Sequence, residues 1–333
     1  MVEKILLVSC KPDPHLTSVV NLMNEQKIPF FRLNTEDLLL DYEFSWNCDN
    51  KSNESFYIKN VVNGSTIHSS EIKSVWCRRP EEPKSLLYDN NKDVNYHNLL
   101  EAKTFYRYLM YFLSDCYSIG NFFYDKYAAS KFVQLSLATK LGMEIPETCF
   151  SNTKRDLVKI ADKYDDLLIK PLYSGHINVN EDYNYVLFAT KINSDDLKSQ
   201  PEESFAQTVN FCENYVPKKY ELRVTVMGPH IFACKIDSQS QSEKEGKIDW
   251  RQGHGHNLKH ELIELPSSVK DFCRKFLRKL HLNFGCFDFI VKPDDNYVFL
   301  ECNPNGQWGW IEDELGIPMT EALVDCLVNK LEV

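Results

Sequence analysis

Long apolar runs are missing from this chain of 333 residues. No apolar stretch approaches the ~18 residues that indicate a membrane-spanning helix. The first ten residues, MVEKILLVSC, contain only a short apolar run, without the positively charged start or the small-residue cleavage site of a secretory signal. We therefore expect a cytoplasmic protein.

Cysteine patterns that bind metals are also missing, although the chain has 11 cysteines. None belongs to a C-x-x-C pair or to a Cys/His cluster. Several lie within apolar runs, where a thiol behaves as a small hydrophobic side chain. We expect these cysteines to be reduced and structural.

Positive charge is scarce as well. The chain has 48 acidic against 38 basic residues, which gives a net charge of -10. This balance argues against nucleic acid or a membrane surface as the partner and favours a small molecule or a peptide. The hydrophobic share of 43% is ordinary for a globular protein, and the length allows two or three domains.

Two apolar runs flank a turn-forming cluster within residues 284–306, FGCFDFIVKPDDNYVFLECNPNG. The pattern predicts a β-hairpin. A turn at Asp294 and Asp295, or a wider one over residues 293–296, places Asp288 opposite Glu301, with their Cβ atoms ~5 Å apart. The opposite face is then expected to carry four core-forming side chains: Phe287, Phe289, Val298 and Leu300.

Three oxygen-bearing side chains converge on the polar face of this hairpin. Asn303 lies two residues beyond Glu301, so the period of a strand directs both to the side of Asp288. Two facing carboxylates repel each other unless a cation neutralises them. Hard oxygen ligands favour Mg²⁺, or Mn²⁺ in its place, and Mg²⁺ keeps positions for phosphate oxygens. The hairpin therefore predicts a nucleotide triphosphate site; the alternative is a solvated hairpin whose acidic residues face water.

The N-terminal segment has a β-α-β pattern, followed by short alternating runs typical of hairpins in residues 35–75. Arg78 and Arg79 follow a strand-like stretch, and two guanidinium groups there could grip a carboxylate or a phosphate. The alternative is a basic pair on the surface. An aromatic-rich helix is expected over residues 94–116.

Two lysines stand out in the middle of the chain. Lys131 lies in a helix expected over residues 126–141, and Lys170 closes the apolar strand-like run LLIK. A lysine at the end of an interior strand indicates an anion such as phosphate, although its side chain could instead extend to solvent.

The remaining chain predicts a strand, a hairpin and a covering loop. Residues 205–215 are expected to form a strand that enters a linker, and residues 218–237 a hairpin with Glu221 and Arg223 on one face. The polar segment 238–257 is typical of a mobile loop, which Trp250 and Arg251 would anchor.

The order of these features resembles the ATP-grasp enzymes over residues 120–333: two lysines, a strand that enters a linker, the tripeptide E-L-R, and D…E-x-N. The stretches SVWCRRP, KIDWR and CNPNGQWGWIE are similar to ribosomal-peptide maturases of the microviridin and graspetide type. These enzymes close ester or amide links between side chains of a precursor peptide.

This resemblance implies a role for each matching residue. Lys131 and Lys170 would hold the phosphates of ATP, while Glu213 and the backbone of Tyr215 and Val216 would meet the adenine. The metal ligands would be Asp288, Glu301 and Asn303. Arg223, Arg251 and Lys170 would act in catalysis, facing the γ-phosphate and the substrate carboxylate.

The resemblance also implies an α/β (α+β) ATP-grasp fold with a small N-terminal α/β domain. We predict domains at residues 1–118, 119–210 and 211–333, the last carrying the metal site. A second copy of the chain, in a homodimer, is a further candidate partner.

The implied reaction makes a carboxylate electrophilic by transfer of the γ-phosphoryl group, so that a hydroxyl or an amine can attack it. We predict an ATP-dependent ligase that acts on Asp or Glu side chains of a ribosomal precursor peptide with a leader and a core. The alternatives are a ligase of free amino acids and a nucleotide-binding scaffold without activity.

Overall fold

A parallel sheet begins the computed structural model, which describes residues 2–51, 53–84, 91–173, 176–178, 184–240, 244–252 and 258–333. Its strand order is β2-β1-β6-β7. Helix α1 begins at Asp13, whose carboxylate accepts the N–H groups of His15 and Leu16, and Pro14 occupies the first turn. The predicted β-α-β start is thus confirmed, with these bounds: β1 Lys4–Ser9, α1 Pro14–Glu25, β2 Phe30–Asn34, β6 Ile72–Cys77 and β7 Ser118–Ile119.

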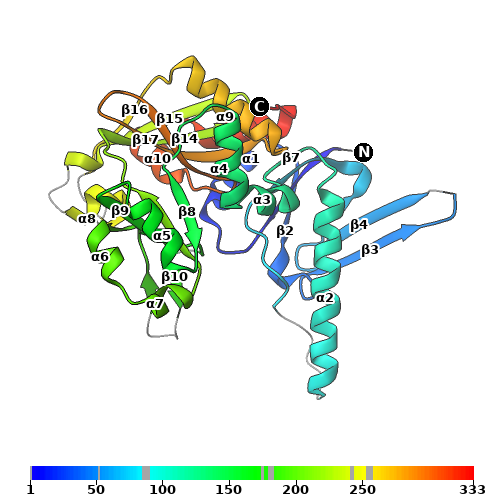
Figure 1. Cartoon of the computed structure of the whole chain (residues 1–333). Coiled ribbons are helices and arrows are strands. Elements are labelled where there is room, and N and C mark those ends of the chain that lie inside the picture. Colours follow the sequence, from blue (N-terminus) through cyan, green and yellow to red (C-terminus); the bar gives the residue numbers. More distant parts are fainter. Residues whose placement is uncertain are drawn as a thin grey trace.

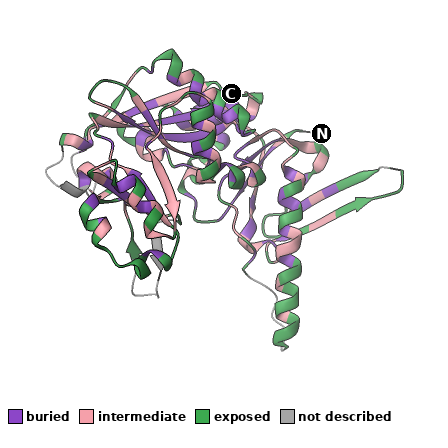
Figure 2. Ribbon diagram, viewed as in Figure 1, coloured by how far each residue is buried: buried purple, intermediate pink, exposed green. Residues whose placement is uncertain are grey.

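A small antiparallel sheet and a long helix extend from this parallel sheet. The sheet has the order β3-β4-β5, and α2 is the predicted aromatic-rich helix. Figure 1 shows β3, β4 and α2 projecting from the body of the molecule, and Figure 2 shows that their outer ends are exposed. The bounds are β3 Tyr42–Cys48, β4 Glu54–Asn60, β5 Thr66–His68 and α2 Lys92–Leu113.

The middle of the chain forms a four-stranded antiparallel sheet with the order β12-β9-β13-β8. Helices α5, α6 and α7 supply side chains to one core with this sheet. Strands β10 and β11 form a separate two-stranded antiparallel sheet. The bounds are β8 Thr148–Ser151, α5 Lys154–Ala161, β9 Asp166–Lys170, β10 His176–Asn178, β11 Asn184–Val186, β12 Thr190–Asn193, α6 Ser194–Ser199, α7 Glu202–Ala206 and β13 Asn210–Asn214.

Two predicted elements of this region are wrong in their bounds. The strand expected over residues 205–215 is confined to β13, because Glu202 and Glu203 open α7, where acidic side chains favour a helix start, and Phe205 packs into the core. The helix expected over residues 126–141 is two helices, α3 Phe122–Ala128 and α4 Lys131–Lys140.

A five-stranded antiparallel sheet completes the fold, with the order β16-β15-β14-β17-β18. Helix α9 packs its apolar side chains on one face of this sheet. A second core is shared with the N-terminal parallel sheet, α1 and α11, so these two regions pack as one body. The bounds are β14 Tyr220–Met227, β15 His230–Ile236, α8 Lys244–Ile248, β16 His260–Leu262, α9 Ser267–Lys279, β17 Phe284–Val291, β18 Tyr297–Asn303, α10 Gly309–Leu315 and α11 Met319–Asn329.

Within the described ranges, no helix has the length and apolar character needed to cross a membrane.

Candidate active site

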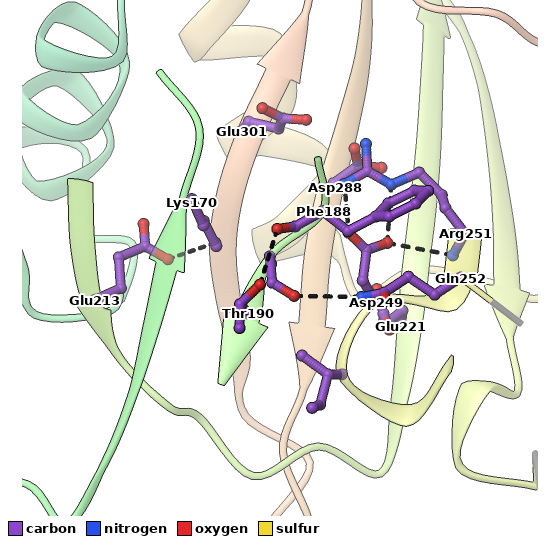
Figure 3. Close-up of polar contacts among 12 residues, drawn as sticks. Lys170, Phe188, Thr190, Glu213, Glu221, Asp249, Arg251, Gln252, Asp288 and Glu301 are labelled. Atoms are coloured by element: carbon purple, nitrogen blue, oxygen red, sulfur yellow. Dashed lines mark hydrogen bonds and ion pairs between the residues drawn. The ribbon is translucent and has the colours of Figure 1, made fainter. Parts of the chain in front are cut away.

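Three neighbouring strands bring the predicted metal-binding carboxylates together. Strand β17 lies between β14 and β18, and its Asp288 is paired with Arg223 on one side and with Glu301 on the other. Both carboxylate oxygens of Asp288 accept hydrogen bonds from Nη1 of Arg223 at 2.8 Å. The predicted pairing of Asp288 with Glu301 is confirmed, and Figure 3 shows both on adjacent strands.

The hairpin reaches this pairing through a β-bulge. Near the turn Phe289 pairs with Phe299, whereas Asp288 pairs with Glu301, so the register shifts between them. Leu300 is therefore the additional residue on β18. A bulge of this kind re-aims the side chains that follow it.

Because of the bulge, the side chains predicted for the apolar face of the hairpin are partly wrong. Val298 and Leu300 do not join the aromatic core; they pack with Val216 and Ile290. Ile290 lies two residues from Asp288 and thus on the same side of β17. An apolar patch, Val216–Ile290–Val298–Leu300, consequently adjoins the carboxylates.

A lysine approaches the carboxylate pair from α4. Lys131 is the first residue of this helix, and its ammonium group contacts the carboxylate of Glu301. Burial by itself raises the pKa of Glu301, but Lys131 and then Lys170 and Arg251 overcome this effect and lower the pKa to about 2. Glu301 therefore stays ionised at neutral pH.

The effects on the pKa of Asp288 balance in the opposite direction. Burial raises its pKa and the negative charge of Glu301 adds to the rise, although Arg223 opposes both. Two adjacent carboxylates that repel each other in this way are stabilised by a divalent cation.

Asn303 is the third predicted ligand. It is exposed at the end of β18, and its Oδ1 accepts the N–H of Asn305 at 2.9 Å. The described residues contain no group of three or more His, Cys, Asp and Glu side chains that would hold a metal. The candidate set consists of two carboxylates and one amide oxygen, which fits a hard cation such as Mg²⁺.

The central sheet supplies the side chains that face the carboxylate pair. Lys170 ends β9, and its ammonium group contacts Glu213 on β13 (Figure 3). Glu213 is 1% exposed, and its Oε1 has no hydrogen-bond partner among the described residues. This buried oxygen can accept a hydrogen bond from an amino group such as that of adenine.

The linker after β13 also faces the cleft. Val216 is buried in the apolar patch Val216–Ile290–Val298–Leu300. The N–H of Tyr215 donates to the carbonyl of Asp166 at 2.9 Å. Tyr215 can therefore offer a ligand its carbonyl but not its N–H group.

Arg251 lies on a segment that contacts both sides of the candidate site. Its Nε and Nη2 donate to Asp249 at 2.8 and 2.6 Å, and the next residue, Gln252, donates to the carbonyl of Ala189 at 3.3 Å (Figure 3). Trp250 packs on Trp310 with ring centroids 5.4 Å apart. These contacts agree with the predicted anchoring of this segment, which also contains the unpredicted helix α8.

The structure thus brings Lys131, Arg223, Asp288 and Glu301 into direct contacts, with Lys170 and Arg251 close enough to act on Glu301 electrostatically. The sequence also offers a phosphate-covering loop at Ser174 and Gly175, and it places His254 and His256 in a segment that is more typical of a loop than of a metal site. All four residues lie outside the described part of the chain. The sequence interpretation missed Asp249, His15 and Asp125, because their contacts join segments far apart or depend on burial.

No protein-family model matches the chain, and no curated protein matches it. Solved structures do match. A RiPP-associated ATP-grasp ligase from Chryseobacterium gregarium, solved with ADP and a leader and core peptide, has 25% identity and a TM-score of 0.84 over 99% of this chain and 97% of that one. The macrocyclase MdnC from Microcystis aeruginosa MRC, bound with precursor peptide MdnA, has 23% identity and a TM-score of 0.80 over 98% and 100% of the two chains. The macrocyclase MdnB from the same organism has 25% identity and a TM-score of 0.74 over 98% and 99%.

The fold and the arrangement of the cleft define the chain as an ATP-grasp protein. Within that class its similarity to the RiPP-associated ATP-grasp ligase from Chryseobacterium gregarium extends over nearly all of both chains.

Proposed function

We propose that the chain is an ATP-dependent ligase that activates Asp or Glu side-chain carboxylates of a ribosomal precursor peptide. It joins them to Ser or Thr hydroxyls or to Lys amines, which gives ω-ester or ω-amide cross-links. The observation that carries this proposal is the full-length similarity to a ligase solved with ADP, leader and core, combined with the acidic and basic side chains that line the cleft.

In this proposal the metal ligands are Asp288, Glu301 and Asn303, which would hold Mg²⁺, or Mn²⁺ in its place. The negative charges of the two carboxylates and their position beside Lys131 support this assignment. When bound, Mg²⁺ would neutralise charge on phosphate oxygens.

Lys131 and Lys170 would bind the phosphates of ATP. Without ATP, the ammonium group of each lysine contacts a carboxylate of the protein. When ATP binds, each ammonium group would either leave that carboxylate for a phosphate group or contact both. Glu213, the carbonyl of Tyr215 and the side chain of Val216 would surround the adenine, because they supply an unused acceptor and an apolar surface. ATP supplies the phosphoryl group that makes the peptide carboxylate reactive.

Arg223, Arg251 and Lys170 would stabilise the charge that develops during transfer. Arg223 and Arg251 are each held by a carboxylate, which fixes the guanidinium before a substrate arrives. Phosphoryl transfer depends mainly on such positioning and charge neutralisation.

The experiment is incubation of the protein with the precursor peptide encoded beside its gene, ATP and magnesium. Attack of the hydroxyl or amine on the acyl phosphate expels inorganic phosphate, so each cross-link lowers the mass of the peptide by the elements of one water. Mass spectrometry should show this loss once per ring, with one ADP and one phosphate formed for each. Addition of mass from free amino acids would instead support the alternative ligase. Bound ATP without any product would support the scaffold alternative.

The proposal extends to the setting of the reaction. We expect a cytoplasmic enzyme whose macromolecular partner is the precursor peptide, not nucleic acid or a membrane, and we retain the division at residues 1–118, 119–210 and 211–333. A homodimer would be detected by sedimentation of the purified protein.

A further inference from the structure

The parallel sheet has a topological switch point between β1 and β6, because the chain leaves β1 toward β2 on one side and β6 toward β7 on the other. Ligands of open α/β sheets bind beyond the carboxyl ends of strands at such a point. Here the segment after β18 lies across it. His15 accepts the N–H groups of Trp308 and Gly309 at 3.3 and 3.1 Å, and Nη1 of Arg78 donates to the carbonyl of Asn305.

Arg78 occupies this switch point with an unused hydrogen-bonding edge. The residue is 1% exposed, and its guanidinium lies 5.3 Å from the ring centroid of Trp308. Its Nε and Nη2 have no hydrogen-bond partner among the described residues. These two groups form the side edge of the guanidinium, the edge that binds both oxygens of a carboxylate.

The acidic side chains nearby that the structure describes accept no hydrogen bond from Nε or Nη2 of Arg78. Asp125 accepts a hydrogen bond from Nδ2 of Asn305 at 2.7 Å through Oδ2, while its Oδ1 has no partner within the described part of the chain. Burial raises the pKa of Asp125 to about 8, so it carries little charge at neutral pH. Asp13 accepts hydrogen bonds from Ser9 and from the start of α1. A buried guanidinium left in this state is stabilised when an anion reaches it.

The unused edge lies beside the proposed metal site. Asn305 follows the proposed ligand Asn303 by two residues, and Nη2 of Arg223 lies 3.4 Å from the carbonyl of Gln307. Arg78 and Arg223 therefore contact the same short segment. Arg79, the residue after Arg78, is exposed and adds a second guanidinium at this strand end.

We propose that Arg78 and Arg79 form the site that receives the acceptor carboxylate of the peptide, the Asp or Glu side chain that the enzyme activates. This inference rests on the proposed function. Arg79 attracts the carboxylate from solvent, which matters in a protein with a net charge of -10. The side edge of Arg78 then orients both oxygens next to the metal-binding carboxylates, with rearrangement of the covering segment as the peptide enters.

The test compares Arg79→Gln and Arg78→Lys with a matched control, Arg107→Gln, which removes an exposed arginine from α2. Arg78→Lys keeps the charge but lacks the planar side edge. Two synthetic core peptides of the neighbouring precursor serve as probes: one with its acidic acceptors, the other with Asn and Gln in their place. Binding is measured with ADP and magnesium present, and KM and kcat are measured with ATP.

We expect each variant at Arg78 and Arg79 to weaken binding of the acidic peptide by roughly tenfold to a hundredfold, as for the loss of a charged hydrogen bond. The neutral peptide should bind the parent and the variants equally, and ADP affinity should not change. The control should bind both peptides as the parent does. Thermal unfolding of each variant shows whether it is folded. If Arg78→Lys is not folded, Arg79→Gln still tests the site.

Equal weakening of the acidic and neutral peptides, or no weakening, would overturn the inference and leave Arg78 a structural link between β6 and the segment after β18. The proposed function fails separately. If the parent forms no dehydrated product, the equilibrium binding of the two peptides still decides whether the arginines bind the acceptor carboxylate.

Discussion

At the scale of single residues, the charge of the candidate site is unevenly distributed. Glu301 has its pKa lowered to about 2 while the pKa of Asp288 is raised, although they are cross-strand partners. The difference arises because Lys131 contacts Glu301, whereas among the described residues the hydrogen bonds of Asp288 come from Arg223. Glu301 therefore favours its ionised form more strongly than Asp288 and is the carboxylate of the pair that we test for holding a cation.

We predict that Glu301→Gln lowers the rate of ADP formation by roughly a hundredfold or more, since a metal ion contributes several kcal/mol of charge stabilisation. The variant should also bind ADP more weakly in the presence of magnesium, while ADP binding without magnesium changes little. Calorimetric titration with and without magnesium measures both. Glu261→Gln, on exposed strand β16, is the matched control. If magnesium strengthened ADP binding to Glu301→Gln as much as it does to the parent protein, the metal assignment would be refuted.

At the scale of elements, the segment between β18 and α10 is tightly packed. A Cβ added to Gly306 would lie 2.4 Å from Cβ of Cys286 and 2.8 Å from Nη2 of Arg223. Only glycine fits there without displacing β17 or the guanidinium. The segment can therefore link the candidate metal strand to the N-terminal sheet only because position 306 lacks a side chain.

Gly306→Ala should lower the free energy of unfolding by about 1–3 kcal/mol, the usual cost of overpacking. It should also reduce turnover, because Arg223 must shift. Denaturant unfolding and ADP release measure the two effects. Gly64→Ala is the comparison: an added Cβ there meets nothing within 4 Å, and only the left-handed backbone, with φ of 73°, opposes it. Equal losses in the two variants would show that packing at Gly306 is unimportant.

His15 gives the junction of α1 and α10 a dependence on pH. Burial, with the positive charge of Arg78 adding to it, lowers the pKa of His15 from 6.5 to about 4. The neutral ring accepts the N–H groups of Trp308 and Gly309. The unfolded chain therefore binds this proton more readily. The contribution to stability is complete above pH 6.5 and is lost as the pH falls toward 4.

We predict that this loss amounts to about 2–3 kcal/mol between the two ends of the window. Urea unfolding at a series of pH values measures it. His15→Gln, which retains an acceptor oxygen but does not titrate, should show a correspondingly flatter profile. Profiles of equal slope for the two proteins would assign the pH dependence to other groups.

The same elements show how far the sequence could predict the structure. The sequence placed Asp288 opposite Glu301 through a turn centred on Asp294 and Asp295, but the loop between Lys292 and Asn296 has one residue more than a two-residue turn. The pairing is still found because the bulge on β18 compensates for this shift in register. Period-two alternation could not locate the bulge at Leu300, since the alternation Phe287, Phe289 and Val298, Leu300 is equally consistent with an unbroken ladder. The contact of His15 with Trp308 spans almost the entire chain, so no local pattern indicates it.

At the scale of the whole molecule, the residues of the candidate site come from a large body and a smaller lobe. The N-terminal and C-terminal sheets share a core, whereas the central sheet has a core of its own. Figure 1 shows the central sheet, with β8 and β9, set apart from the other two. The smaller lobe carries Lys170 and Glu213, and the larger body carries Asp288 and Glu301. A peptide bound in the cleft would touch both.

A leader-binding surface should lie outside this cleft. The sequence offers two candidate surfaces: the aromatic helix α2 and the hairpin β14-β15. Strand β14 is enclosed between β15 and β17, and β15 is paired on its other side with β16 from Cys234 to Ile236, so only the first part of β15 keeps a free edge. Helix α2 exposes Tyr96 and Tyr108 by 65% and 66%. Within the described residues, no large hydrophobic side chain of β14 or β15 is exposed, so of these two surfaces we test α2 for docking.

Deletion of the leader should raise KM for the precursor sharply and leave the affinity for ADP and magnesium unchanged. The physical reason is that a core whose side chains vary cannot supply most of the binding energy, so a separate segment must hold the peptide while the reacting groups are oriented. Calorimetry of the leader alone, with and without nucleotide, measures the docking directly. Tyr96→Ser/Tyr108→Ser tests α2, and Tyr127→Ser, another exposed tyrosine, is its control. If the leader does not bind detectably under either condition, recognition must lie in the core sequence and the cleft.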